Sequence, residues 1–117
     1  MNGRVLSGLL AKGSWDDGAT LRFKHIVLKP QTRVAMADGV AVHLTAKEFD
    51  LLLFLASHPG QVFTREELML SVWDYTTPVD CSTVTVHVRR LREKVESDPE
   101  HPRYVKTVWG VGYKFEA

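Results

Sequence analysis

Three arginines stand close together in the segment TVTVHVRRLREK, which runs from Thr83 to Lys94. Arginine presents its N–H donors in a planar fork that matches a phosphate or the O6/N7 edge of guanine. The residues before the arginines add hydroxyl groups, which can contact phosphates, and valine, which can contact a thymine methyl group. This mixture favours the recognition of a DNA groove, provided that the arginines point away from the core.

A solvated basic surface with no partner is the alternative interpretation, because clusters of Arg and Lys are common on protein surfaces. Catalysis and metal binding are less well supported. The five histidines are scattered along the chain, and Cys81 and His87 do not share a helical face. The sequence has no nucleophile elbow, phosphate-binding loop or dinucleotide-binding turn. We therefore expect no enzyme, no metal and no cofactor.

The composition is that of a single soluble domain. Of 117 residues, 44% are hydrophobic and 25% charged, and the formal net charge is +1. No apolar run approaches the roughly 18 residues that suggest a membrane span. Cys81 is a lone cysteine, which fits a reducing cytoplasm. A redox role for Cys81 near a helix start is an alternative to a small residue simply tolerated there.

The periodicity of the arginine-bearing segment predicts a helix and not a strand. In a strand, Arg90 and Arg92 would continue the face that the valines begin. In a helix, one apolar stripe recurs at i, i+4, i+7 and i+11, formed by Val84, Val88, Leu91 and Val95. Asp80 or Ser82 is expected to cap its start. The opposite, outward face then carries Ser82, Val86 and Arg90, flanked by Thr83, His87 and Arg89.

The elements that must position this helix begin with an antiparallel sheet. Residues 1–20 have recurrent glycines and no sustained period, so we expect a tail or linker there, followed by one domain over 21–117. Leu21–Leu28 is expected to be one strand. Asp38-Gly39 separates two Val-rich runs and predicts a hairpin, because a type I′ turn needs positive φ at both central residues.

Two further helices carry capping boxes at their starts, TAKE at Thr45–Glu48 and TREE at Thr64–Glu67. The first should end before Pro59. Residues 74–80 are polar and contain a proline, which predicts a loop. A second hairpin is expected around residues 109–112. A capped helix, a loop, a basic helix and a glycine hairpin, in that order, indicate an α+β winged helix-turn-helix with the basic helix as the reader.

Three separated segments carry a resemblance to a known family. LTAKEFDLLLFLASHPGQVFTREELMLSVW, TVTVHVRRLREKVE and YVKTVWGVGYKF resemble the effector domain of OmpR/PhoB-type response regulators. The resemblance covers the chain from about Leu21 to its end. It implies a four-stranded N-terminal sheet, three helices and a C-terminal wing. It also implies transcriptional control through promoter DNA, usually as a dimer on direct-repeat half-sites.

The same resemblance implies further partners. The loop that contacts RNA polymerase in several members corresponds here to Tyr75, Thr76, Thr77, Pro78 and Val79. The leading residues are too few for a receiver domain, so we expect an isolated effector half that meets a sensor kinase only through an absent receiver. No membrane partner is expected. A winged-helix module that binds protein and has lost DNA binding is the alternative function.

The family's DNA-contacting helix positions correspond to Ser82, Thr83, Val86, His87, Arg89, Arg90 and Arg92. Thr107 and Tyr113 match wing positions that touch the DNA backbone, and Lys106 and Lys114 are expected to neutralise phosphates. Two positions depart from the pattern. Some members have arginine at the position of Ser82. Trp109 is a further candidate DNA contact. It stands where many members carry an arginine that enters the minor groove, so we expect the wing to dock on the backbone without strong minor-groove reading.

Overall fold

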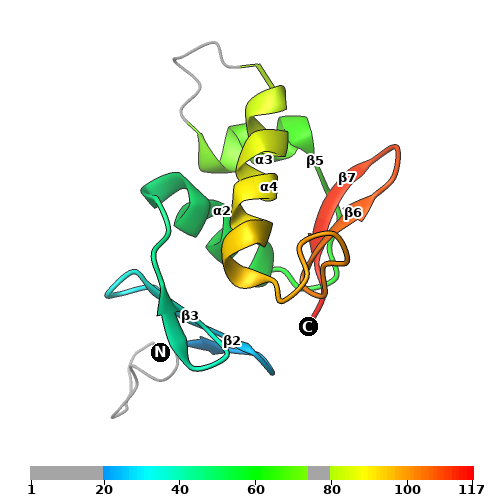
Figure 1. The fold of residues 1–117 in the computed structure, drawn as a ribbon. Helices are drawn as coiled ribbons and strands as arrows, with labels where there is room; N and C mark the ends of the chain where they lie inside the picture. Colours follow the sequence, from blue (N-terminus) through cyan, green and yellow to red (C-terminus); the bar gives the residue numbers. More distant parts are fainter. Residues whose placement is uncertain (1–19, 74–79) are drawn as a thin grey trace.

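The computed structural model describes residues 20–73 and 80–117 (Figure 1). Its elements are β1 (Leu21–Arg22), β2 (Ile26–Lys29), β3 (Val34–Ala37), β4 (Val40–Val42), α2 (Ala46–Ala56), β5 (Phe63–Thr64), α3 (Arg65–Val72), α4 (Ser82–Val95), β6 (Val105–Val108) and β7 (Gly112–Phe115). The winged helix-turn-helix architecture predicted from the sequence is confirmed. Over the described ranges, the helices are too short or too polar to cross a membrane.

The N-terminal sheet has four antiparallel strands in the order β1-β2-β3-β4. The prediction of one strand over Leu21–Leu28 is wrong: the chain reverses after Arg22, and Leu21 pairs with Leu28. Phe23 donates its N–H to the carbonyl of Ile26 over 2.8 Å, and its ring packs on Phe115 with 4.6 Å between centroids. Apolar and polar residues alternate before the turn and apolar residues follow it, so the sequence pattern of a single strand continued through the reversal.

The predicted hairpin between β3 and β4 is confirmed. Asp38 and Gly39 have φ of 52° and 79°, the two positive values that a type I′ turn requires.

Both predicted capping boxes are present. The Thr45 hydroxyl accepts a hydrogen bond from the Glu48 N–H, and the Glu48 carboxylate accepts one from the Thr45 N–H, over 3.2 and 3.0 Å. Thr64 and Glu67 make the equivalent pair over 3.0 and 2.8 Å. Helix α2 ends at Ala56, before Pro59 as predicted. These caps satisfy backbone donors that each helix start would otherwise leave unpaired.

Helix α4 buries the predicted apolar stripe, formed by Val84, Val88, Leu91 and Val95. The prediction that Asp80 or Ser82 is the capping residue is wrong, because Cys81 occupies the N-cap position, although Asp80 still bonds to the helix start. Its carboxylate accepts the Ser82 N–H over 3.1 Å, which lowers the pKa of Asp80, whereas Ser82 is already the first helical residue. Cys81 occupies the cap position, and its side chain makes no capping hydrogen bond.

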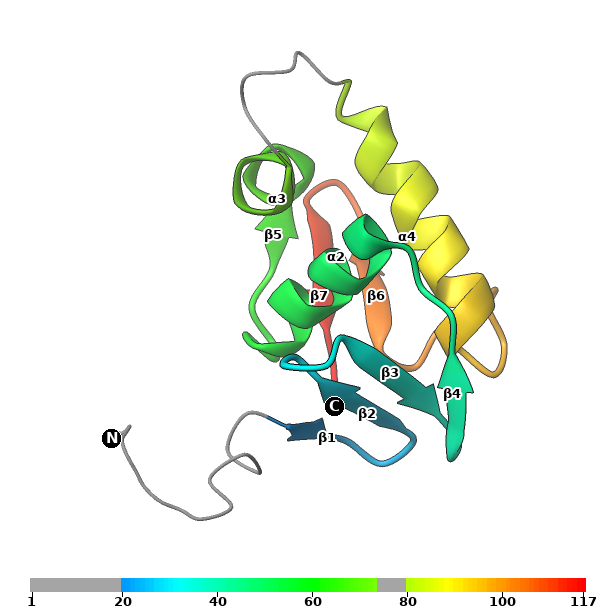
Figure 2. The ribbon, with the colours of Figure 1, turned by 90° about the vertical axis from the view of Figure 1, so that its left-hand side faces the viewer.

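The C-terminal hairpin of β6 and β7 is the predicted wing. It belongs to a second sheet with the order β5-β7-β6. Figure 2 shows β6 and β7 behind α2 and beside α4, β5 beneath α3, and the four-stranded sheet at the bottom of the view. Gly112 is required where β5 meets β7, because a Cβ atom at this position would lie 1.9 Å from the carbonyl oxygen of Phe63. The register pairs Thr107 with Tyr113 and Lys106 with Lys114, so these two pairs lie on opposite faces.

A buried carboxylate joins α2 to α4. Glu48 is 1% exposed, and its carboxylate lies 2.6 Å from the Lys94 ammonium group. Burial by itself raises the pKa of Glu48, but the hydrogen bonds from Lys94 and Thr45 outweigh it and bring the pKa below its ordinary value. The ionised form of Glu48 is therefore the one that stabilises the fold.

We expect this pair to make stability depend on pH in the acid range. Because the pKa of Glu48 is lower in the folded state, its contribution is present above the unfolded pKa of about 4.5 and is lost as pH falls through the folded value. Urea unfolding of the wild type and of Glu48→Gln should therefore show a difference in unfolding free energy that shrinks on acidification. A difference that stays constant from neutral pH to about pH 3 would contradict this role.

Candidate nucleic-acid interface

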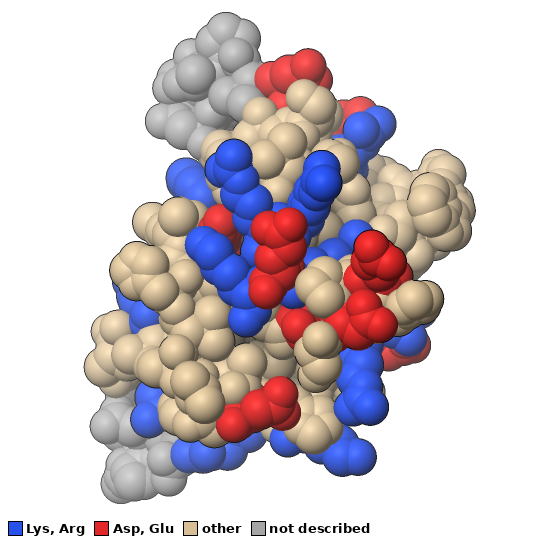
Figure 3. Space-filling model, in the orientation of Figure 1, with Lys and Arg blue, Asp and Glu red and all other residues tan. Residues whose placement is uncertain are grey.

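The outward face of α4 is exposed as the helical wheel predicted. Ser82, Val86, Arg89 and Arg90 all reach solvent, and Val86 is 42% exposed. Figure 3 shows Lys and Arg side chains gathered over the centre of this face, where α4 lies, with acidic side chains among them. Helix α4 thus presents arginine, hydroxyl and methyl groups together, opposite the stripe that holds it to the core.

His87 and Thr83 lie at the side of this face that borders α3. The Nδ1 atom of His87 is 2.8 Å from the carbonyl oxygen of Thr83, and its ring meets the edge of Trp73 with 5.0 Å between centroids. Both residues are half-buried. His87 is therefore held in one orientation, with its Nδ1 atom already engaged by the helix backbone.

Arg92 is directed toward the wing instead of outward. Its Nε donates to the carbonyl of Val105 over 2.9 Å, and its Nη2 donates to the Thr107 hydroxyl over 2.8 Å. The guanidinium carbon lies 5.8 Å from the centre of the Tyr113 ring. Burial lowers the pKa of Arg92. Arg92 thus links α4 to the wing with two of its five N–H donors.

Tyr113 completes this junction. It is buried, and its hydroxyl lies 3.5 Å from the Thr85 hydroxyl on α4. Arg92, Thr107 and Tyr113, which the sequence predicted as separate contacts, therefore form one cluster between α4 and the wing. A hollow of about 560 Å³ opens beside it, bordered by Thr85, Arg89, Arg92, Glu93, Asp98, Pro99, Glu100 and Tyr113.

Lys106 lies apart from the other candidate residues. It shares the outer face of the hairpin with Lys114, because both are out of phase with Thr107 and Tyr113. Its ammonium group lies 2.6 Å from the Glu116 carboxylate, and that of Lys114 lies 3.6 Å from it. The hydrogen bond from Lys106 lowers the pKa of Glu116. The structure therefore does not bring Lys106 to the exposed face of α4.

Trp109 stands at the tip of the wing and is 89% exposed. The turn that carries it is closed by a hydrogen bond from the Val111 N–H to the Val108 carbonyl over 2.9 Å, and Gly110 has φ of 80°. The tip is thus a short, fixed turn with an indole at its end.

Sequence reasoning missed the residue that anchors the wing. Glu96, at the end of α4, is 7% exposed. Its carboxylate accepts the N–H groups of Arg103, Tyr104 and Val105 over 2.8, 3.0 and 2.9 Å, respectively. A carboxylate after an amphipathic helix normally reads as surface charge, so no sequence signal indicated this role.

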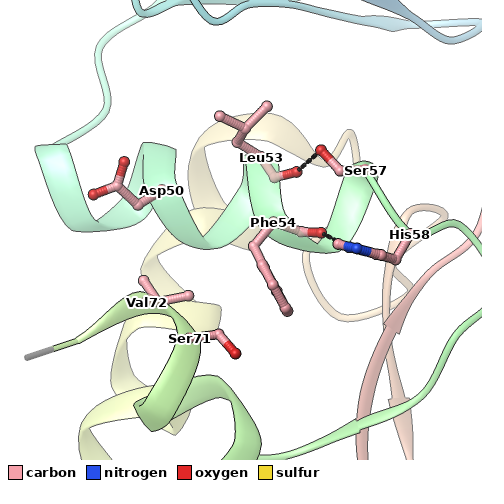
Figure 4. A pocket seen from close by; sticks show the side chains of 7 residues that line it. All are labelled: Asp50, Leu53, Phe54, Ser57, His58, Ser71 and Val72. Carbon is pink, nitrogen blue, oxygen red and sulfur yellow. Dashed lines mark hydrogen bonds between the residues drawn. The ribbon is translucent and has the colours of Figure 1, made fainter. Parts of the chain in front are cut away.

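A second hollow lies between α2 and α3, away from the outward face of α4. Figure 4 shows its lining by Asp50, Leu53, Phe54, Ser57, His58, Ser71 and Val72, around about 350 Å³. The Ser57 hydroxyl donates to the Leu53 carbonyl, and Nδ1 of His58 lies 2.8 Å from the Phe54 carbonyl oxygen. These polar groups are engaged by the α2 backbone and do not form a catalytic pair. Across 20–73 and 80–117, no cluster of His, Cys, Asp and Glu could hold a metal ion.

Comparison with known proteins agrees with this arrangement. Residues 39–115 match the sequence family described as "Transcriptional regulatory protein, C terminal". The chain belongs to this family. The family is one of transcriptional regulators and is not an enzyme class. The predicted polymerase-contacting residues, Tyr75 to Val79, and the predicted tail up to residue 19 lie outside the described residues.

The chain is also similar to individual proteins of known sequence or structure. The Staphylococcus aureus transcriptional regulatory protein SrrA is 46% identical over 99 residues, covering 82% of this chain and 40% of SrrA. The chain thus spans well under half of that relative. The Thermotoga maritima response regulator DrrB, an OmpR/PhoB homologue, superposes with a TM-score of 0.80 at 38% identity, over 85% of this chain and 45% of DrrB. The Klebsiella pneumoniae RstA DNA-binding domain, solved with its RstA box, gives 0.74 at 34% identity, over 83% and 96%.

Proposed function

We propose that this chain binds double-stranded DNA sequence-specifically and regulates transcription as the effector part of a two-component response regulator. The observation that carries the proposal is the face of α4, which exposes Val86, Arg89 and Arg90 opposite a fully buried stripe. A helix of this kind fits the major groove, where arginine reads guanine and a methyl group meets thymine. Its family membership and its likeness to the DNA-bound RstA domain support the same function.

The structure suggests a division of roles within the proposed interface. Ser82, Val86 and Arg90 share the centre of the outward face, with Thr83 and His87 beside them, and we infer that they meet base edges. Arg89 borders the same hollow as Arg92 and Tyr113, on the side of α4 toward the wing, and we infer that it contacts a phosphate. Arg92 retains N–H donors for a phosphate while its other donors hold the wing.

Arg89→Ala tests the phosphate contact. Removing one phosphate contact should weaken binding to specific and to random duplexes about equally, and should reduce the slope of log K against log salt by about one unit. Fluorescence anisotropy at several salt concentrations measures both effects. Arg22→Ala is the matched control, because Arg22 is exposed on the N-terminal sheet. An unchanged slope in Arg89→Ala would remove Arg89 from the interface.

A protein-binding module without DNA affinity is the second candidate function. The observation that favours it is the group of acidic residues, Glu93, Asp98 and Glu100, that borders the same hollow as Arg89. Retention of the chain on random DNA that falls steeply with salt supports nucleic-acid binding, whereas absence of retention supports the protein-binding module.

The wider setting is part of the same proposal. The DNA-binding unit comprises residues 21–117, binds direct-repeat half-sites as a weak homodimer in the cytoplasm, and contacts RNA polymerase through residues 75–79. A receiver domain outside this chain would connect it to a sensor kinase. Titration of duplexes that carry one or two half-sites measures the dimer, because cooperative binding needs the second half-site.

A further inference from the structure

The tip of the wing exposes two apolar side chains that take no part in the proposed contacts between α4 and DNA. Trp109 is 89% exposed and Val111 is 52% exposed, and both belong to the turn between β6 and β7. Exposed apolar patches mark binding surfaces, and Trp109 and Val111 lie two residues apart on the same turn. In Figure 3 the end of the hairpin, at the right of the view, carries no charge.

Backbone hydrogen bonds fix the turn that carries the indole. The Val111 N–H bonds to the Val108 carbonyl, and Val108 pairs with Gly112 directly behind the turn. Arg92 fixes Thr107 to α4, and Trp109 follows two residues later, roughly 7 Å further along at the usual strand rise. Figure 1 shows the hairpin projecting beside α4 beyond the body of the molecule. A duplex that receives α4 would therefore meet this tip at its neighbouring groove.

The charges around the tip do not favour electrostatic reading of that groove. Lys106 and Lys114 lie on the outer face of the hairpin and contact Glu116. On the protein, a hollow of about 590 Å³ lies between the tip of the wing and the start of α3. It is bordered by one basic residue, Arg65, and one acidic residue, Glu66. A narrow A·T-rich minor groove attracts inserted cations. The tip offers an apolar surface instead, and apolar side chains act in minor grooves by entering between base pairs.

We propose that Trp109, backed by Val111, enters the minor groove as an apolar wedge at one base step and bends the duplex. The proposal rests on the proposed DNA-binding function. It adds a second source of sequence specificity, the contact between the wing tip and the minor groove. Unstacking is easiest at pyrimidine–purine steps, so the preferred site should carry a TA or CA/TG step under the tip. The wedge would thereby select sequence at base pairs that α4 does not touch.

The test uses the whole chain and a duplex of about 30 base pairs that the wild type selects from a random pool. End-attached dyes report bending by energy transfer, and 2-aminopurine at single positions reports unstacking. The wild type should change both signals at one step. Trp109→Ala should lose both signals and bind about tenfold more weakly, because one stacking contact is removed. Trp109→Phe should keep both signals, because a second aromatic ring can enter the same step.

Two further variants sharpen the test. Trp109→Arg should exchange the preference for a flexible step for one toward A·T-rich grooves. Val40→Ala removes an exposed apolar side chain from β4 and should leave every signal unchanged. Wild-type binding without bending or unstacking, at an affinity that Trp109→Ala shares, would overturn the wedge and leave the proposed function standing. Failure of the wild type to bind any duplex would overturn both. Loss of self-association in Trp109→Ala without loss of bending would assign the tip to a protein contact and overturn the wedge.

Discussion

Arg90→Ala should weaken binding to the preferred site by about 1–3 kcal/mol, which corresponds to about fivefold to 150-fold. Arg90 is exposed at the centre of the outward face of α4, one helical turn beyond Val86. A guanidinium group in this position can bond to O6 and N7 of one guanine at once, and alanine offers neither bond. The variant should therefore lose discrimination mainly at that single base pair.

Competition binding against every single-base variant of the selected site measures this effect. Arg22→Ala, on the N-terminal sheet, removes the same charge far from the reading face and should change neither affinity nor preference. An even loss of affinity across all site variants would show that Arg90 clamps the DNA backbone. Val86→Ser refines the result, because it should reduce discrimination between thymine and uracil, which differ by the methyl group that valine would contact.

Glu96→Ala should lower the unfolding free energy by about 3 kcal/mol, because three backbone N–H groups lose their acceptor. At this chain length the melting temperature should fall by about 15 °C. The same N–H groups, at Arg103, Tyr104 and Val105, should exchange with solvent faster in the variant than the amides of α2 do. The wing would then be the part of the domain that loosens first.

Glu96→Gln keeps the volume of the side chain and one acceptor oxygen, so its cost should be smaller than that of alanine. Glu100→Gln is the matched control, because Glu100 lies in the same connection and is exposed. Thermal unfolding and amide exchange of the three variants give the comparison. If Glu96→Ala and Glu100→Gln have the same melting temperature, Glu96 is dispensable. The Arg92 contacts from α4 and the sheet itself would then position the wing.

Local patterns in the sequence determined most of the architecture. The two Thr-x-x-Glu boxes, the Asp38-Gly39 turn and the helical period of the Val84 stripe each depend on residues within a few positions of one another. Such interactions act over one turn of helix or one hairpin, so their signals survive in the linear sequence. The outward position of Arg89 and Arg90 follows from the same period, because a helix that buries one stripe must expose the other.

Only the tertiary structure decided which candidate side chains face solvent and which bind other parts of the protein. Arg92 and Arg90 differ by two positions, yet one binds the wing and the other faces solvent. Their difference depends on where β6 lies relative to α4, and that placement comes from Glu96 and the β5–β7 contact at Gly112. The strand pleat alone separates Lys106 from Thr107, but the packing of β6 against α4 decides that Thr107 is the one that contacts Arg92.

The division has one physical cause. Propensities, caps and amphipathic periods are local, and a sequence states them wherever they occur. Contacts between residues far apart in the chain arise from packing, such as Glu48 with Lys94 or the Tyr104 hydroxyl with the His25 N–H over 2.8 Å. No local pattern specifies the partner of a buried carboxylate or of a half-buried arginine, so their roles became visible only when the elements were assembled.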